Sequence, residues 1–454
     1  MTAAHPARTR GSILGGMVLA LVACQPAEPR TQQAAPVKDV LPAKAEVQPP
    51  TAVPEDAHRV VFADRIAYSY VLLLAPETPP NVSAPTKQEL RALVQKAFPG
   101  REHEEEVELL LGLIDSEAPD EGGPLLDVGV QAGENEPKKP PAPSPAPTPA
   151  ATKQAVAVAN AAASEPASGE VEIDASAQEA LRRKRRLTDL LGLSVAAHPL
   201  GPASPGEAPM IDPAILREPT LARDLSPAEL ASLDHRTQAL VVRARYRNQH
   251  GVRGLRLLQT MVRLLAEQHK ALIHDPDTRE TLTRETFHRT RLQTKLGNVA
   301  DQLPVVPFQD RVHTVDGKPG VRLTTRGMRR FGSVDLELDG LPADPAVLQQ
   351  ASHFLYGVAF NLIRLGEYDR SGYAIEMPDA IHVHYRDCAQ AYASRNEKLP
   401  RCQDCPEEVR LHLVERPSEP QDATGHVVAR VVAPRHVSDA PDYVQSKWAL
   451  NALE

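Results

Sequence analysis

Thr237-Gln-Ala-Leu-Val-Val-Arg-Ala-Arg-Tyr246 is apolar in its first half and then alternates apolar with charged residues, which predicts a β-strand. After a turn framed by Gly251 and Gly254, apolar residues recur at helical spacing from Leu255 to Gln268. A short apolar run, Ala271 to His274, follows. This order predicts a β-α-β unit, and such a crossover favours two parallel strands.

The β-α-β unit lies within a larger predicted domain, residues 172–454. We expect helices at 175–193 and 346–365 and a helix start at Ser226-Pro227-Ala228-Glu229, where Ser precedes Pro and Glu stands at the third helical position. Alternating segments predict a hairpin and four further strands, at 311–325, 334–338, 380–385, 409–415 and 426–432. The domain is therefore expected to be α+β with a mixed sheet.

Residues 230–370 of this domain resemble bacterial domains of unknown function. The resemblance is carried by four motifs, Val242-Arg243-Ala244, His274-Asp275-Pro276, Thr325-Arg326-Gly327-Met328 with Phe331-Gly332, and Asp335-Leu336. It implies no activity. Gly251-x-x-Gly254 lacks the full glycine-rich fingerprint and the Lys-Ser/Thr pair of a phosphate-binding loop, so nucleotide binding is not favoured.

Residues 58–130 are predicted to form a smaller α+β module. Arg65 to Leu74 reads as a buried strand, and Thr86 with Glu89 forms a capping box before a helix that runs to Phe98. A second helix is expected over 104–114, with glutamates in its first turn, where the helix dipole favours negative charge. About 70 residues is near the size where a single core is marginal, so we expect this module to pack on the C-terminal domain.

The order of elements in this module resembles the front half of parvulin-type prolyl isomerases. The resemblance places Tyr70 where that family has its strand histidine, and Gly122-Gly123 at its glycine pair. It implies a degenerate isomerase or folding factor. The chain departs from the family, because a proline-rich segment stands where the closing helix and last strands should be, and the only histidines, His58 and His103, lie outside the pattern.

The N-terminus has the pattern of an export signal. Basic residues at Arg8 and Arg10 precede the apolar run Ile13 to Ala23, which is much shorter than the ~20 residues of a membrane-spanning helix. Leu21-Val22-Ala23-Cys24 resembles the lipobox of bacterial lipoproteins. That resemblance implies removal of residues 1–23, a lipid on the Cys24 thiol and an acyl chain such as palmitate on the new amino terminus. The alternative is an ordinary secretory peptide followed by a chance cysteine.

Two low-complexity segments separate these parts. Residues 24–57 are rich in Pro, Ala, Gln, Thr and Glu, and residues 131–171 are rich in Pro and then Ala, which accounts for many of the 43 prolines. Such segments bury too little apolar surface to offset the entropy of ordering, so we interpret them as a disordered tether and a linker. Gln25 beside the lipidated cysteine, by the lipoprotein resemblance, implies the outer membrane, facing the periplasm.

The remaining cysteines predict the sharpest local site. His382-x-His384 lies on an expected strand, which places both rings on one side, and Cys388, Cys402 and Cys405 follow. Cys402-x-x-Cys405 with Cys388 and a histidine has the spacing of a four-ligand zinc site. A structural disulfide between two of the three cysteines is the favoured interpretation, and a catalytic redox pair is a further alternative. We expect no cofactor otherwise.

Three charged clusters are candidate sites. Arg326, Arg329 and Arg330 beside a glycine could form an anion pocket, although a solvated surface is favoured. His274 with Asp275 and Asp277 could ligate a metal, although Asp-Pro-Asp is first a turn signal. Five consecutive basic residues, 182–186, could contact anionic lipid or nucleic acid, but an exported protein is not expected to meet nucleic acid, and a solvated helix face is favoured.

Charge and motif content bound the function. The formal net charge of −8 argues against nucleic acid as a partner, because phosphate binding relies on clustered Lys and Arg. No serine-hydrolase, zinc-protease or calcium-loop motif is present. The sequence therefore favours a lipid-anchored envelope protein that binds or scaffolds a partner protein without catalysis. An isomerase-type folding factor, and a metal or thiol site through Cys388, Cys402 and Cys405, are the alternatives.

Overall fold

The structure is a computed structural model, and its described residues fall within one compact unit, 55–454. These residues are 61–62, 65–117, 125–128, 180, 186–201, 210–218, 221–222, 224–247, 251–293, 299–368, 375–376, 380–391, 408–417, 419, 422, 427–440 and 443–450. The predicted signal peptide, tether and linker, together with Cys24, Cys402 and Cys405, lie outside them. The α+β class expected from the sequence is confirmed, with two mixed sheets and packed helices.

The first sheet is built around one long buried strand, β2 (Arg65–Leu73). The strand order is β4-β5-β2-β6-β7, with β3 parallel to β2. The other members are β3 (Leu125–Val128), β4 (Leu190–Pro199), β5 (Gln238–Arg247), β6 (Leu272–His274) and β7 (Thr281–Leu282). β5 and β6 both pair antiparallel with β2. They therefore run in the same direction, as the β-α-β pattern predicted, but β2 lies between them.

The position of β2 changes the expected organisation of the chain. β2 and β3 come from the segment 58–130, whereas the other strands of this sheet come from 172–454. The two segments, which the sequence presented as separate modules, share one sheet and one hydrophobic core. The small size of the first segment gives the physical reason, since its helices alone bury too little apolar surface.

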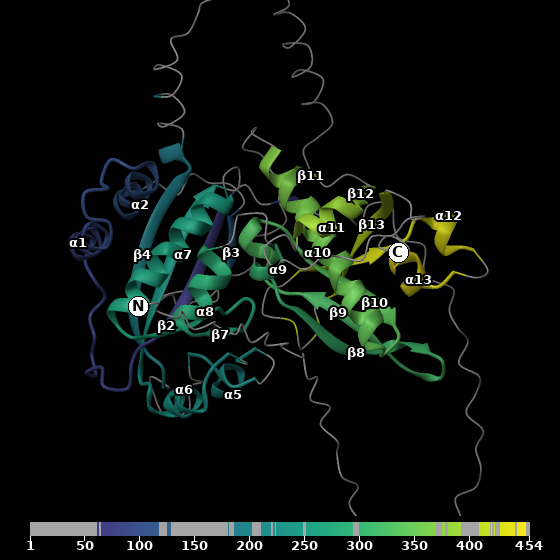
Figure 1. Cartoon of the computed structure of the whole chain (residues 1–454), viewed down its shortest axis with the longest axis horizontal. Coiled ribbons are helices and arrows are strands. Elements are labelled where there is room, and N and C mark those ends of the chain that lie inside the picture. Colours follow the sequence, from purple (N-terminus) through teal and green to yellow (C-terminus); the bar gives the residue numbers. More distant parts are fainter. Residues whose placement is uncertain are drawn as a thin grey trace, which may run out of the picture. The chain divides into compact units, whose positions relative to one another are not determined.

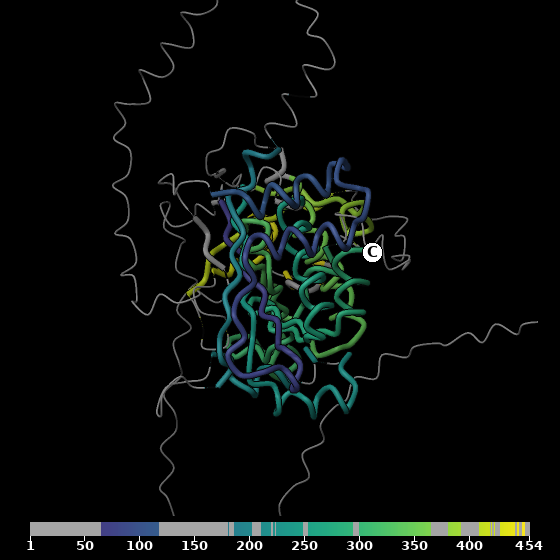
Figure 2. Tube along the Cα trace, turned by 90° about the vertical axis from the view of Figure 1, so that its left-hand side faces the viewer, coloured from purple at the N-terminus to yellow at the C-terminus, as the bar shows by residue number. Residues whose placement is uncertain are grey.

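Helices cover both faces of the first sheet. α7 (Gly251–Gln268) lies along one face (Figure 1) and packs Leu258, Met261 and Leu265 into the core. Figure 2 shows α1 (Lys87–Ala97) and α2 (Glu105–Asp115) side by side. On the opposite face, a second apolar cluster forms under α5 (Pro213–Leu216), α6 (Pro227–Ser232) and the turn η1 (Leu233–His235). The capping boxes predicted at Thr86 and Ser226 are both present.

The second sheet has the order β12-β13-β14-β10-β9-β8. Its strands are β8 (Val305–Val315), β9 (Lys318–Thr325), β10 (Asp335–Leu341), β12 (Ile381–His384), β13 (Glu408–Arg416) and β14 (Val428–Val432). Only β10 and β14 pair in parallel. The long helix α10 (Pro345–Tyr368) packs on this sheet with α11 (Tyr385–Ala391) and α13 (Gln445–Leu450), and the Phe354 and Trp448 rings meet edge to face at 5.9 Å.

Short elements complete the described chain. They are α8 (Arg284–Phe287), the π-turn η3 (His288–Leu292), α9 (Val299–Gln302), the 3-10 turn η4 (Met328–Phe331), α12 (Arg435–Ser438) and a two-stranded ribbon of β1 (Val61–Phe62) and β11 (Ile375–Glu376). Within the part of the chain that is described, none of the helices combines the length and apolar composition that crossing a bilayer requires.

Two local predictions are wrong. The helix expected over 175–193 does not reach its predicted end, because Leu190 to Leu193 belong to β4 and pair with β5. α7 begins at Gly251, so Gly254 is a helical residue and not part of a turn. A Cβ at position 254 would lie 2.5 Å from the Tyr246 ring, which shows that this glycine allows the helix to approach β5.

Candidate functional site

A fully buried arginine, Arg330, joins the two sheets. It lies in η4, and its Nη2 donates to Oδ2 of Asp275, which follows β6, at 2.7 Å. Nη1 donates to the Tyr70 hydroxyl at 3.3 Å and Nε to the Gly327 carbonyl at 3.0 Å. The guanidinium also lies over the Tyr68 ring, 5.0 Å from its centroid. The arrangement links the first sheet to the second through a buried ion pair.

The groups around Arg330 are matched to it electrostatically. Burial by itself lowers the pKa of Arg330, but the carboxylate of Asp275 raises that pKa well above its ordinary value. Tyr68 donates to the other oxygen of Asp275 at 2.7 Å, and Gln259 donates to Tyr70 at 3.0 Å. Burial raises the pKa of Tyr70 to about 12. Both tyrosines therefore stay neutral, and the buried charges are paired, as stability requires.

The neighbouring charges are paired as well. Arg329 donates to Asp277 Oδ1 from Nη2 at 2.6 Å and from Nε at 2.9 Å. The solvated surface favoured for Arg326, Arg329 and Arg330 is wrong, since all three are buried. Asp275 holds Arg330 and Asp277 holds Arg329, so two residues of the predicted metal site and two of the predicted anion pocket form one internal ionic cluster.

His274 points into the protein interior. Its Nδ1 lies 3.1 Å from Thr281 Oγ1, and burial lowers the pKa of the imidazole to about 4. Tyr70, which the isomerase resemblance placed at the strand histidine, is also fully buried. Neither side chain reaches solvent in this conformation.

The cysteine region is described only in part. Cys388 lies in α11, is 1% exposed and is a free thiol, and burial raises its pKa to about 12. Cys402 and Cys405 lie outside the described residues, so the disulfide and the zinc site stay predictions. His382 and His384 both contact the Glu408 carboxylate, which confirms that their rings share one side of β12. Among described side chains, no group of three or more His, Cys, Asp or Glu is arranged to hold a metal ion.

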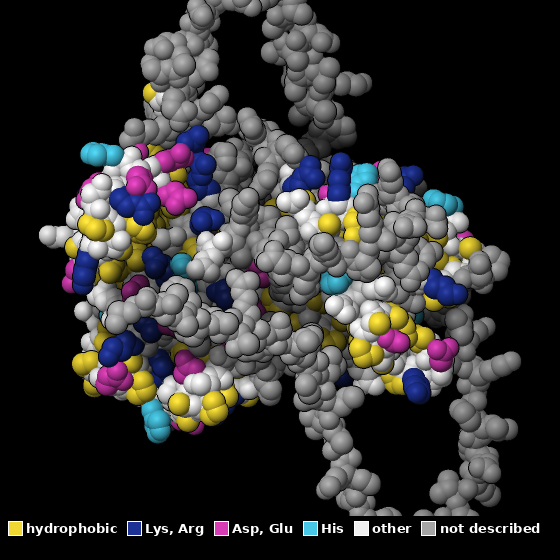
Figure 3. All heavy atoms as spheres, viewed as in Figure 1, with side chains coloured by type: hydrophobic (Ala, Val, Ile, Leu, Met, Phe, Trp, Pro, Cys, Tyr) yellow, Lys and Arg dark blue, Asp and Glu magenta, His cyan; other side chains and the backbone are white. Residues whose placement is uncertain are grey.

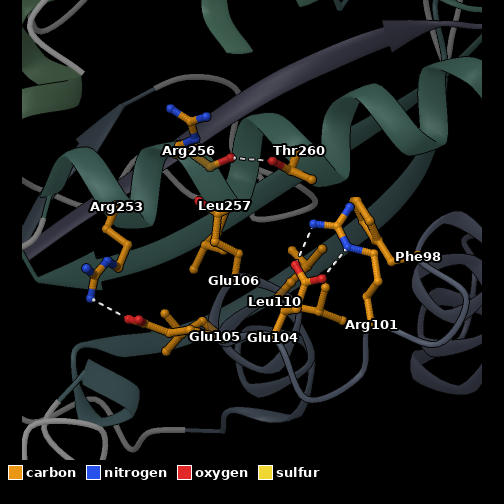
Figure 4. Close-up of a pocket in the computed structure, with 12 residues that line it drawn as sticks. Phe98, Arg101, Glu104, Glu105, Glu106, Leu110, Arg253, Arg256, Leu257 and Thr260 are labelled. Atoms are coloured by element: carbon orange, nitrogen blue, oxygen red, sulfur yellow. Dashed lines mark hydrogen bonds and ion pairs between the residues drawn. The ribbon is translucent and has the colours of Figure 1, made fainter. Parts of the chain in front are cut away.

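A surface pocket of about 280 Å³ lies between α2 and α7. Its apolar lining comes from Phe98, Val107, Leu109, Leu110 and Leu257. Figure 4 shows Arg253 reaching from α7 to Glu105, and Arg101 reaching to Glu104, on two sides of Leu110 and Leu257. Arg253 Nη1 lies 3.4 Å from the Glu105 carboxylate.

The rim of this pocket is charged but balanced. Arg101 stacks on the Phe98 ring at 5.7 Å, and its hydrogen bond lowers the pKa of Glu104. Arg186, the last residue of the basic run, also contacts Glu105. Figure 3 shows basic and acidic side chains intermixed over the surface where α2 lies in Figure 1. An apolar floor with an ionic rim is suited to binding an amphipathic group.

Sequence reasoning did not find this pocket or the bond between Tyr68 and Asp275. The glutamates 104–106 were interpreted only as favourable charges in the first turn of a helix. Glu104 pairs with the nearby Arg101, but the basic partners of Glu105 are Arg186 and Arg253, which lie 81 and 148 residues further along the chain. The packing of α2 on α7 brings Arg253 to Glu105.

Comparisons of the chain with known protein families, with curated proteins and with solved structures found no match.

Proposed function

We propose that this protein is a lipid-anchored component of a bacterial cell envelope that binds or scaffolds a partner protein and has no catalysis of its own. The observation that carries the proposal is the N-terminal pattern of basic residues, a short apolar run and Leu21-Val22-Ala23-Cys24. Lipid on Cys24 supplies more than one acyl chain, which stable anchoring requires. The low-complexity segment 24–57 acts as a tether between the lipid and the folded unit.

Acylation and fractionation in a host with two membranes test the anchor. Labelled palmitate should enter the parent protein, and Cys24→Ser should abolish the label and release the protein from membranes. Gln25→Ala, which keeps the cysteine, is the matched control and should remain labelled. Gln25→Asp should keep the label but move the protein to the inner membrane. Equal acylation of the Cys24→Ser variant would contradict the proposal.

The pocket between α2 and α7 supports the binding role, because its apolar lining lies between the ion pairs of its rim. A photo-crosslinker at Glu106, an exposed residue of the pocket lining, should give one defined adduct in the native envelope. A crosslinker at Val312, which is 83% exposed on β8, is the control and should give none. Equal adducts at both positions would remove the support that the pocket gives.

A metal or thiol site is the second candidate function. The observation that favours it is the shared contact of His382 and His384 with Glu408, three residues after Cys405. The test is metal content together with intact mass of the protein purified from an oxidising compartment. One zinc per chain with three reduced thiols would support the site. A mass two units below the reduced value without metal would indicate a disulfide instead.

A further inference from the structure

β4 is an edge of the first sheet among the described strands, and from Leu193 to His198 it lacks the usual protection of an edge. Its residues, Leu190–Pro199, include no Asp, Glu, Lys or Arg, and proline appears only at the last position. Natural edge strands are commonly protected by charges, proline or bulges against pairing with another chain. β8, an edge of the second sheet, has all three, namely Pro307, Asp310 with Arg311, and a register shift between Gln309 and Thr314.

Part of the β4 edge is already occupied. The Ser116 hydroxyl donates to the Leu190 carbonyl at 2.7 Å, and Glu117 forms an antiparallel bridge with Gly192. The register of β4 on β5 also shifts between Leu190 and Gly192. From Leu193 onward, no described strand pairs with the outer edge of β4.

The hydrogen-bond alternation shows which backbone groups point outward. Leu200 N donates to Thr237 O at 2.9 Å, and the register continues with His198 opposite Ala239. In an antiparallel ladder, alternate residues bond to the same neighbour. Ser194, Ala196 and His198 therefore bond to β5. The N–H and C=O groups of the intervening residues, Leu193, Val195 and Ala197, are directed to the outer edge, while their side chains pack on the core.

We propose that β4 pairs antiparallel with β4 of a second copy of this chain across a two-fold axis, so that the two first sheets become one. An outward-directed residue must lie opposite another outward-directed residue to form the ladder hydrogen bonds, which restricts the register. With the axis at Val195, that residue faces its own copy and each Leu193 faces Ala197 of the other copy. Moving the axis to Ala196 would oppose Leu193 to Pro199, which has no N–H. With the axis at Ser194, Ala196 of the other copy would lie opposite Gly192, and Glu117 already occupies that position.

The composition of β4 matches this occupant. A strand that pairs with its own copy across a two-fold axis places each charge near an identical charge, and like charges in such pairs are destabilising. β4 has no charged side chain. Ser194 faces Ala196 of the other copy in this register, so small side chains meet on the face away from α7.

The test measures the mass of the mature full chain in mild detergent by sedimentation across the micromolar range. The parent protein should form a dimer. Ala197→Pro removes an outward N–H without removing a bond to β5, and proline is tolerated at an edge, so this variant should dimerise at least tenfold more weakly. Ser194→Ala keeps the backbone donors and is the matched control, which should remain dimeric. A parent that is monomeric throughout, or a fully dimeric Ala197→Pro variant, would overturn the proposal.

Residue-resolved hydrogen exchange on the parent protein decides the question if Ala197→Pro does not fold. The amides of Leu193, Val195 and Ala197 should be protected at high protein concentration and should exchange faster on dilution. The amides of Ser194 and Ala196 should be protected at both concentrations. Protection of the outward amides that does not change on dilution would show that a segment of the same chain covers the edge, and the dimer would then be rejected.

Discussion

Replacement of Arg330 tests whether one buried charge holds the two sheets together. Arg330→Met keeps an unbranched stem of similar length and removes the guanidinium. Asp275, itself fully buried, then loses its partner at 2.7 Å, and the Tyr70 hydroxyl and the Gly327 carbonyl each lose a donor. No solvent reaches these groups to replace the lost bonds.

The expected loss follows from the groups left behind. Removing one partner of a buried ion pair destabilises a protein by about 3–5 kcal/mol, because the remaining charge is uncompensated. Neutral groups left without a donor each add about 1–3 kcal/mol when they cannot relax. We therefore expect a loss of at least ~4 kcal/mol, which is a large fraction of the ~5–15 kcal/mol of a typical domain.

The assay is equilibrium urea unfolding followed by circular dichroism. Arg101→Met, which removes the arginine of an exposed pair, is the matched control and should leave the midpoint unchanged. Asp275→Asn combined with Arg330→Met should be less destabilising than the sum of the two single changes, because it removes the stranded charge. A loss below ~1 kcal/mol for Arg330→Met would refute the reasoning, since the carboxylate would then have to be solvated or protonated at no penalty.

Three further outcomes follow from other buried contacts. Gly254→Ala, which in an exposed helix would stabilise, should instead lower the melting temperature through a loss of about 1–3 kcal/mol, because its Cβ meets the Tyr246 ring at 2.5 Å; an unchanged or raised melting temperature would contradict this. The buried His274 stays neutral down to about pH 4, whereas the unfolded protein takes up this proton near pH 6.5. Urea midpoints should therefore fall from pH 6.5 to 4, and less steeply in His274→Gln; parallel pH profiles would exclude His274 as the cause. Cys388, whose pKa is raised to about 12, should resist alkylation at pH 8 until the protein unfolds, and stability should decline as the pH rises above 9, where only the unfolded thiol ionises. Peptide mass spectrometry measures the labelling, and rapid native labelling would show that Cys388 is accessible.

Much of the local structure could be predicted because it depends on neighbours in the sequence. Thr86 with Glu89 and Ser226 with Glu229 form capping boxes within four residues, and both helices begin where the pattern indicated. Apolar periodicity located β2, β5 and α7 for the same reason. These signals also predicted the α+β class, because the class depends on which elements are present and not on how they are arranged.

The candidate site was predicted only in pieces. His274, Asp275 and Asp277 were recognised as one charged group and Arg326, Arg329 and Arg330 as another. The sequence did not indicate that the aspartates of the first group pair with the arginines of the second. The structure pairs Asp275 with Arg330 and Asp277 with Arg329, more than fifty residues apart in sequence, so two apparent sites neutralise each other. A charge pattern indicates which groups are available, but their pairing depends on how the two sheets meet.

The sequence by itself determined the low-complexity composition of two segments, the boundaries of β2, α1 and β5 to within about a residue, and the fold class, since each is encoded within a few neighbouring residues. Tertiary structure decided that β2 lies between β5 and β6, that Leu190 to Leu193 form a strand, and that Arg330 is buried. The physical reason is that strand pairing and charge pairing join residues far apart in the chain.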